Sequence, residues 1–293
     1  MAKKELIRRL AVAAVGIPLA LVLLILGGWA LAGTIGVVAA LVTAELFRIA
    51  RARGVEAFPW IGIPASLALV LLGGAFPSLS RASPWALAIL LAAVLLSFTS
   101  AVWFRGPGRN PLAAVAVTVL GILYGGGCLS FAVFLRHVPD APGGPLEGLP
   151  LQGPVLLALP LAVTWVGDSA AYLLGSWFGR HKLMVSVSPG KTVEGGVSGL
   201  AASVLTGGGV GYFLLGLHPE AGISGLLGAG IGLVLGFGAQ VGDLAESLVK
   251  REAGVKDSGA TLPGHGGFMD RFDALIFNLP LTYVLISLIG ALS

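Results

Sequence analysis

The stretch that decides the fold is LAVAAVGIPLALVLLILGGWALAGTIGVVAALVTA, residues Leu10–Ala44, in which 35 consecutive positions carry no charge. A helix needs about 20 apolar residues to cross a bilayer. The run is therefore too long for one membrane-spanning helix, and Gly27-Gly28 near its middle permits a turn. We expect two short spans here, covering roughly residues 10–27 and 30–47.

Further apolar runs follow along the whole chain. They are Ala57–Ser80, Ala82–Phe104, Asn110–Leu135, Gly148–Gly167, Gly195–Leu217, Ala221–Gly242 and Ala274–Ser293. We expect the span that begins at Gly148 to continue past Asp168 to about Trp177. The predicted fold is therefore an all-α, polytopic integral membrane protein with about nine transmembrane helices.

The composition supports this fold class. Charged residues make up 11% of the 293 residues, where a soluble domain has roughly 25%, and hydrophobic residues make up 56%. This composition excludes a soluble globular domain, a disordered chain and a protein with a single anchor. One cysteine excludes a disulfide framework and a cysteine metal cluster. Gly228, Gly232 and Gly236 recur every four residues, which predicts close helix packing.

The basic residues indicate the orientation. With a cytoplasmic N-terminus, the nine-span topology places 16 of the 18 Lys and Arg residues inside and only Arg81 and Arg136 outside. Cytoplasmic loops of membrane proteins carry such an excess. The net charge of +4 then reflects topology, and no basic, aromatic stripe suggests nucleic acid as a partner. We expect one membrane domain, residues 1–293, with N-terminal helices in 1–135 and catalytic helices in 151–293.

The acidic residues gather in the second half of the chain. Eight of the 14 are Asp168, Glu194, Asp243, Glu246, Glu252, Asp257, Asp270 and Asp273. Most of them lie on two predicted cytoplasmic loops or at the span ends that border these loops. We name these the first motif loop, residues 179–195, and the second motif loop, residues 242–273.

The first motif loop contains Gly190-Lys191-Thr192, which invites comparison with a P-loop. That motif requires glycine five residues earlier, where Val185 stands, and no strand is expected in a helical bundle. A basic turn with a hydroxyl at a helix start can still bind phosphate through backbone N–H groups. A plain capped loop is the alternative.

The second motif loop suggests a cation site. Asp243, Glu246 and Ser247 share one helix face, and Asp270 and Asp273 are three residues apart at the next helix start. Mg²⁺ takes one or two protein carboxylates and substrate phosphates, which nearby Lys and Arg would also hold. Solvated surface ion pairs are the alternative. Asp168, an acid inside a span, is a functional candidate or else has an interhelical partner.

The second motif loop resembles the signature of the phosphatidate cytidylyltransferase (CDP-diacylglycerol synthase) family. The matching stretches are Ser247–Arg251, Lys256–Gly259 and Leu262–Asp273, the last reading LPGHGGFMDRFD. The first motif loop and the helix before it are also similar, at Asp168, Ala171-Tyr172, Gly175, Phe178–Arg180, Ser188-Pro189 and Lys191–Gly195. The chain departs from the family at Gly190, where a second Lys is usual, which leaves Lys191 as the expected phosphate ligand.

The resemblance implies the transfer of the cytidylyl group of CTP to phosphatidate, giving CDP-diacylglycerol and pyrophosphate. It also implies an Mg²⁺-dependent homodimer with a second cation such as K⁺. The enzyme would lie among the lipids of the bacterial cytoplasmic membrane, with its site facing the cytoplasm.

The motif match also carries residue roles to this sequence. It implies metal ligands at Asp243 and Asp270, which with Lys250, Lys256 and Arg271 form the expected catalytic set. The expected substrate-binding residues are Asp168, Ser188, Lys191, Thr192, Glu194, Ser247, Arg251, Asp257, His265, Gly266, Gly267 and Asp273.

Three other functions remain open at this point. A CTP-dependent polyprenol kinase would transfer the γ-phosphate to a lipid alcohol and release CDP. A secondary transporter would use Asp168 as its coupling residue, and inverted repeats with broken helices at the midplane would mark it. A non-catalytic membrane scaffold gives no reason for the acidic pairs.

Overall fold

The computed structural model describes residues 16, 18–76, 78–140, 152–215, 223–259, 261 and 266–292. In this part of the chain six helical segments are long and apolar enough to cross a membrane. They are α2 (Gly28–Ala52), α4 (Leu79–Phe104), the continuous segment Pro111–Arg136, α7 (Gln152–Phe178), α9 (Gly225–Glu252) and Met269–Ile289 of α10 (Met269–Leu292). The prediction of an all-α polytopic membrane protein is confirmed, and the count of nine spans stays a prediction.

The remaining elements are shorter. Pro111–Arg136 consists of α5 (Pro111–Gly121), a π-helical turn η2 (Ile122–Gly127) and α6 (Cys128–Arg136). The other helices are α3 (Pro59–Ala75), α8 (Val193–Val210), the 3₁₀ turns η1 (Pro107–Arg109) and η3 (Val138–Asp140), and the π-helical turn η4 (Gly211–Leu215). Two strands, β1 (Lys182–Met184) and β2 (Ser188–Thr192), complete the fold.

The predicted break in the first apolar run is confirmed. Residues 18–26 are helical, and α2 begins at Gly28. Gly27 and Gly28 have φ values of 60° and 52°, a left-handed conformation that side chains disfavour. Most of the first predicted span lies outside the described residues. The predicted continuation of the span with Asp168 to about Trp177 is also confirmed, because α7 ends at Phe178.

The chain forms two compact units. Unit 1 comprises Met1–Phe134 and Glu252–Phe272, and unit 2 comprises Leu135–Arg251 and Asp273–Ser293. Most of the second motif loop therefore belongs with the N-terminal helices, although it is more than a hundred residues away in sequence. The prediction of a single membrane domain is not tested by this grouping and stays a prediction.

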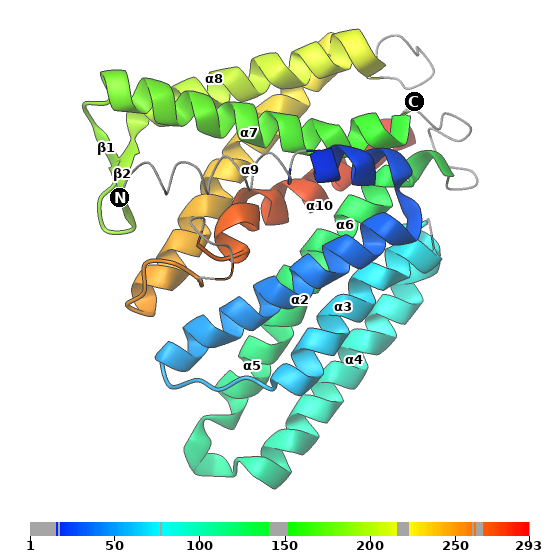
Figure 1. The fold of residues 1–293 in the computed structure, drawn as a ribbon, viewed down its shortest axis with the longest axis vertical. Helices are drawn as coiled ribbons and strands as arrows, with labels where there is room; N and C mark the ends of the chain where they lie inside the picture. The colour runs from blue at the N-terminus through cyan, green and yellow to red at the C-terminus, as the bar shows by residue number, and fades with distance from the viewer. Residues whose placement is uncertain are drawn as a thin grey trace. The chain divides into compact units, whose positions relative to one another are not determined.

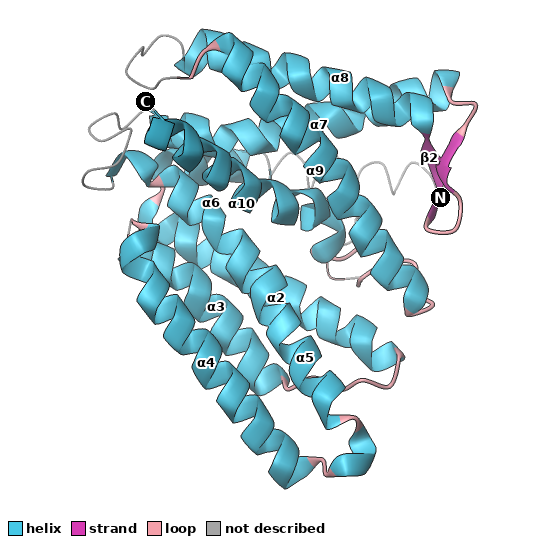
Figure 2. Ribbon diagram, turned by 180° about the vertical axis from the view of Figure 1, so that it is seen from behind, coloured by secondary structure: helices cyan, strands magenta, loops and turns pink. Residues whose placement is uncertain are grey.

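In unit 1, helices α2 to α5 lie side by side (Figures 1 and 2). Their core contains Phe58, Ile61, Leu69, Val115 and Ile122, together with Ala93, Ala101 and Ala114. A close backbone approach fixes this packing. A Cβ on Gly126 of the π-helical turn would lie 2.6 Å from the Cα of Ser66 on α3, so only glycine fits there.

In unit 2, α7 and α8 run side by side in both views (Figures 1 and 2). The core includes Leu156, Leu159, Val163, Leu235 and Ile286. A buried polar contact joins α10 to α7, because Asn278 Nδ2 donates to Thr164 Oγ1 at 2.8 Å. An amide buried among apolar helices needs such a partner, and this contact therefore fixes the register between the two helices.

The glycines of α9 pack against the backbone of α8. A Cβ on Gly228 would meet the carbonyl oxygen of Gly207, and a Cβ on Gly232 would meet that of Ser203. The close packing predicted from the four-residue glycine spacing is confirmed.

The first motif loop contains a β-hairpin, so the expectation that no strand lies there is wrong. Strands β1 and β2 pair antiparallel, with Lys182 opposite Thr192. They connect the end of α7 to the start of α8, where the chain reverses direction and the backbone groups of each strand find partners on the other. The Thr192 hydroxyl caps α8 by accepting from the Gly195 N–H at 3.2 Å.

We predict opposite effects for two alanine substitutions on α9. Gly232→Ala should lower the melting temperature in detergent, because its Cβ would overlap the α8 backbone. Gly230→Ala is the matched control, because a Cβ there meets nothing within 4 Å and alanine favours a helix by about 1 kcal/mol. Thermal unfolding of both variants measures the difference. Equal melting temperatures would contradict the packing assigned to Gly232.

Candidate functional site

Asp243 is the centre of the predicted site in unit 2. Its Oδ2 lies 2.6 Å from Lys191 Nζ, so a residue of the hairpin forms an ion pair with a residue of α9. Ser247, one turn further along α9, donates its hydroxyl to Asp243 Oδ1 at 3.4 Å. The predicted shared face of Asp243 and Ser247 is therefore confirmed, and Lys191 joins it.

Two more carboxylates lie within electrostatic range of Asp243. They are Asp168 from α7 and Asp273 from the first turns of α10. Lys191 offsets part of this charge near Asp168, and Lys250 does so near Asp273. Three helices of unit 2 thus bring acids together, an arrangement in which each anion destabilises the others and a bound cation would stabilise all of them.

Glu246 and Lys250 form an ion pair within α9, with Glu246 Oε1 3.3 Å from Lys250 Nζ. Both side chains are largely buried, with exposed fractions of 1% and 11%. A buried charge of this kind requires its partner, since removing one leaves the other uncompensated. Lys250 therefore has a structural contact in addition to its predicted role with phosphate.

The hairpin is held in place by Glu194 and Arg251. The Glu194 carboxylate accepts from the N–H groups of Arg180 and His181 and lies 2.6 Å from His181 Nδ1. A hydrogen bond from its own backbone N–H and these contacts lower the pKa of Glu194 from 4.5 to about 2. Arg251 Nε donates to the Val187 carbonyl at 3.3 Å, which joins the end of α9 to the hairpin that carries Ser188.

Asp270, in unit 1, lies in a cradle of hydrogen-bond donors at the start of α10. Its Oδ2 accepts from the Ser258 hydroxyl and the Ser258 N–H at 3.0 Å each, and from the Gly267 N–H at 2.8 Å. Gly266 beside it has a φ of 78°, which favours glycine. This explains the predicted glycine turn: Gly266 permits the reversal, and Gly267 provides a donor.

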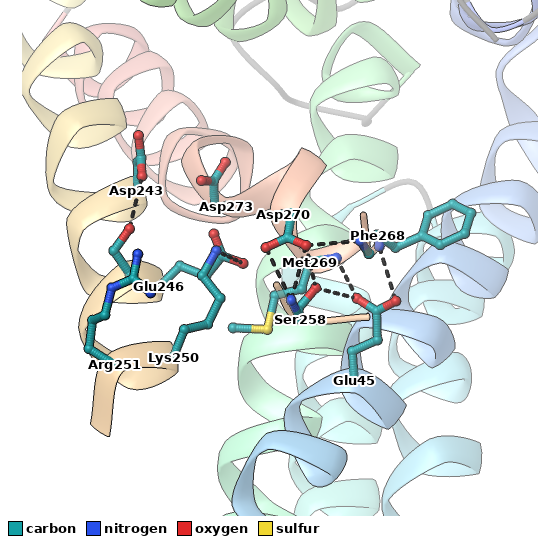
Figure 3. A network of polar contacts seen from close by, with 12 residues as sticks. Glu45, Asp243, Glu246, Lys250, Arg251, Ser258, Phe268, Met269, Asp270 and Asp273 are labelled. Carbon is teal, nitrogen blue, oxygen red and sulfur yellow. Dashed lines mark hydrogen bonds and ion pairs between the residues drawn. The ribbon is translucent and has the colours of Figure 1, made fainter. Parts of the chain in front are cut away.

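Glu45 of α2 is a residue of this site that sequence reasoning missed. Its side chain is buried and accepts hydrogen bonds from the segment around Asp270 (Figure 3). The sequence did contain a signal for Glu45, because it directly follows a 35-residue apolar run. An acid at such a position is as costly as Asp168 and is a functional candidate for the same reason. Its partners could not be read from the sequence.

Three other predicted residues are exposed, and one lies outside the described part of the chain. Lys256, Asp257 and Arg271 lie on the exposed surface of unit 1. His265 lies outside the described residues. Asp243 belongs to unit 2 and Asp270 to unit 1, and their joint binding of a metal stays a prediction.

A cleft of about 320 Å³ lies elsewhere in unit 1. Its lining includes Arg51, Glu56, Trp60, Phe104, Arg105 and Arg109. Arg105 lies 3.2 Å from Glu56 and stacks over the ring of Phe58, so this guanidinium already has partners. None of the predicted site residues lines this cleft.

The sequence profile of the "Cytidylyltransferase family" matches residues 7–289, nearly the whole chain. The chain belongs to this family. Among its relatives in the family, the phosphatidate cytidylyltransferase of Synechocystis sp. is 35% identical over 298 residues, which cover 96% of this chain and 97% of the relative. The phosphatidate cytidylyltransferase of Staphylococcus aureus (strain COL) is 43% identical over 124 residues, 42% of this chain and 46% of the relative.

The donor chemistry of the site fits the Mg²⁺ that the family resemblance implies. Among the described residues, no three His, Cys, Asp or Glu side chains are gathered closely enough to hold a metal by themselves. Mg²⁺ does not require such a cage, because it keeps waters and substrate phosphates beside one or two carboxylates. Asp243 in unit 2 and Asp270 in unit 1 each offer one such carboxylate, and the acids near Asp243 within unit 2 favour a cation beside it.

We predict that Glu194→Gln loosens the hairpin at neutral pH. Its folded pKa is depressed, so its stabilising contacts are complete above pH 4.5 and are lost as the pH falls through about 2. Hydrogen exchange at the Arg180 and His181 amides should therefore show the same wild-type protection at pH 7 and pH 5, after correction for intrinsic rates. The Glu194→Gln variant should lose protection at both pH values, and the control Glu252→Gln should keep it at both. Wild-type protection that falls between pH 7 and pH 5 would contradict the assignment.

Proposed function

We propose that this chain transfers the cytidylyl group of CTP to phosphatidate, giving CDP-diacylglycerol and pyrophosphate. The observation that carries this function is the match to a phosphatidate cytidylyltransferase over 96% of the chain. The match includes the stretch in which Ser258, Gly267 and Asp270 form one hydrogen-bonded cluster.

The deciding experiment follows the α-phosphate of CTP. The purified protein in detergent micelles with phosphatidate and CTP labelled at the α-phosphate should move the label into the lipid. A polyprenol kinase would leave the label in CDP, and a transporter would leave CTP intact. Label that stays in the aqueous phase would overturn the proposed function.

The chemistry is an in-line substitution at the α-phosphorus of CTP. A phosphatidate phosphate oxygen forms the new bond to this phosphorus, and the bond to the pyrophosphate oxygen breaks. Because the attacking oxygen is already an anion, little general-base assistance is needed, and repulsion between two polyanions is the main obstacle. Lys250, Arg251, Lys256 and Arg271 would hold phosphates of either substrate.

The hairpin supplies the second set of phosphate contacts in this proposal. Lys191 would exchange its contact with Asp243 for a phosphate oxygen. Ser188 at the start of β2 and Thr192 at the N-cap of α8 would add hydroxyl and backbone donors. Mg²⁺ held by Asp243 and Asp270 would neutralise the triphosphate and stabilise the leaving pyrophosphate. Asp168, Glu194, Ser247, Asp257, His265, Gly266, Gly267 and Asp273 complete the proposed substrate-binding set.

We place the enzyme in the bacterial cytoplasmic membrane, with the motif loops facing the cytoplasm that supplies CTP. Support comes from the basic residues, 16 of 18 on one side, and from relatives that are bacterial proteins. Phosphatidate would enter from the bilayer, and nucleic acid has no part in the reaction. A homodimer and a second cation such as K⁺ belong to the same proposal.

The topology makes a direct prediction for the C-terminus. Nine spans with a cytoplasmic N-terminus place it outside the cytoplasm, whereas six spans would return it to the cytoplasm. A C-terminal fusion to a reporter that is active only outside the cytoplasm should be active. A fusion in the first motif loop is the control, and it should be inactive. An inactive C-terminal fusion, with a cytoplasmic reporter active at the same position, would contradict nine spans.

We predict a non-additive loss from the two proposed metal ligands. Asp243→Asn and Asp270→Asn should each lower kcat/KM by at least ~10²-fold, because a bound metal supplies several kcal/mol of transition-state stabilisation. The double variant should be little worse than the worse single one, since the two would act on one ion. Label transfer across an Mg²⁺ titration measures this, with Glu252→Gln as the control. Full activity of Asp270→Asn would contradict the shared metal site. So would a double variant whose loss equals the product of the two single losses.

A further inference from the structure

Glu45 is the buried acid of unit 1 that the reaction does not use directly. It lies in the C-terminal half of α2 with 1% of its surface exposed. Its Oε1 accepts from Thr261 Oγ1 at 2.7 Å and from the Phe268 N–H at 3.1 Å. Its Oε2 accepts from Ser258 Oγ at 2.8 Å and from the Met269 N–H at 2.9 Å. Figure 3 shows this carboxylate between α2 and the start of α10.

These donors come from both sides of residues 262–265, the centre of the signature. Ser258 and Thr261 precede this centre, and Phe268 and Met269 follow it. Their partner is more than 210 residues away in sequence, so the contacts fix the segment against a separate transmembrane helix. The amides of Phe268 and Met269 are also early N–H groups of α10, which have no partner within the helix. Glu45 on α2 thus caps the start of α10, and a negative charge is also favourable at a helix N-terminus.

One hydroxyl connects Glu45 to Asp270. Ser258 Oγ lies 2.8 Å from Glu45 Oε2 and 3.0 Å from Asp270 Oδ2, so the two carboxylates approach a single proton from two directions. Gly267 closes the cluster, because a Cβ there would overlap both the Ser258 hydroxyl and the Glu45 carboxylate. Any displacement of Glu45 therefore moves the donors that orient Asp270.

We propose that Glu45 is a positioning residue for the cytidylyl transfer, which holds the Asp270 carboxylate in its working orientation through Ser258, Gly267 and the start of α10. This inference rests on the proposed function. In this proposal Glu45 acts through Asp270, because both of its oxygens accept hydrogen bonds from protein donors. A carboxylate is required because both oxygens must accept hydrogen bonds, and glutamine presents one acceptor where two are used.

The test is Glu45→Gln in the full-length protein, with two independent readouts. Hydrogen exchange in the segment that contains Phe268 and Met269 should speed up at least ~10-fold, because an accepting oxygen is replaced by a donor. kcat should fall at least ~10-fold, and the Mg²⁺ concentration that gives half-maximal activity (the Mg²⁺ requirement) should rise. KM for phosphatidate should change by less than about 2-fold, since only positioning at Asp270 is lost. Glu56→Gln removes the same charge at an exposed site of unit 1 and should change neither readout.

A second single variant and a double-mutant cycle complete the test. Ser258→Ala removes only the bridging hydroxyl and should shift the Mg²⁺ requirement in the same direction, even where Glu45→Gln folds poorly. In an Asp270→Asn background, Glu45→Gln should cost less than about 2-fold more activity, because its effect passes through Asp270.

Three outcomes would overturn the positioning role. They are losses that multiply in the cycle, unchanged exchange at Phe268 and Met269, and an unchanged Mg²⁺ requirement in both variants. If the wild-type protein transfers no label, the proposed function is refuted. The contacts of Glu45 with the segment are tested separately, because hydrogen exchange measures them without any activity.

Discussion

Every carboxylate that this chain keeps among apolar helices must find a cation or a hydrogen-bond donor, because an unpaired ion in such surroundings is too costly. The two units meet this requirement in different ways. In unit 1, Glu45 and Asp270 are surrounded by backbone N–H groups and the Ser258 hydroxyl. In unit 2, Asp243 pairs with Lys191 and Glu246 pairs with Lys250.

These two solutions have different consequences for chemistry. Backbone donors are fixed by the fold, so the cluster around Asp270 is preorganised and presents its carboxylate in one orientation. A lysine side chain is mobile and can exchange a carboxylate for a phosphate. In the proposed reaction, the pair of Lys191 and Asp243 would therefore separate when the polyanionic substrate binds. The reaction proposed above would thus use a rigidly held carboxylate in unit 1 and an exchangeable ion pair in unit 2.

Patterns in the sequence predicted the features that depend on neighbouring residues. Apolar runs predicted helices, and Gly27-Gly28 predicted the break before α2. The spacing of Gly228 and Gly232 predicted close helix packing. The i, i+4 relation of Asp243 and Ser247 likewise follows from helix geometry. The contacts of Glu45 with Ser258 and Met269 were not predictable in this way, because they join residues 213 and 224 positions apart and no local period specifies such a pair.

The hairpin shows the same limit from another side. The sequence between α7 and α8 was expected to be a loop, because no strand is expected in a bundle of membrane helices, but it contains strands of three and five residues. They form because two antiparallel helices bring their ends together and leave the connecting backbone without other partners. Gly190 lies on β2 with open space around it, so packing does not require glycine at this position. Glycine in place of the second Lys that is usual in the family therefore gives the hairpin one positive charge less, and Lys191 stays the residue proposed to bind phosphate.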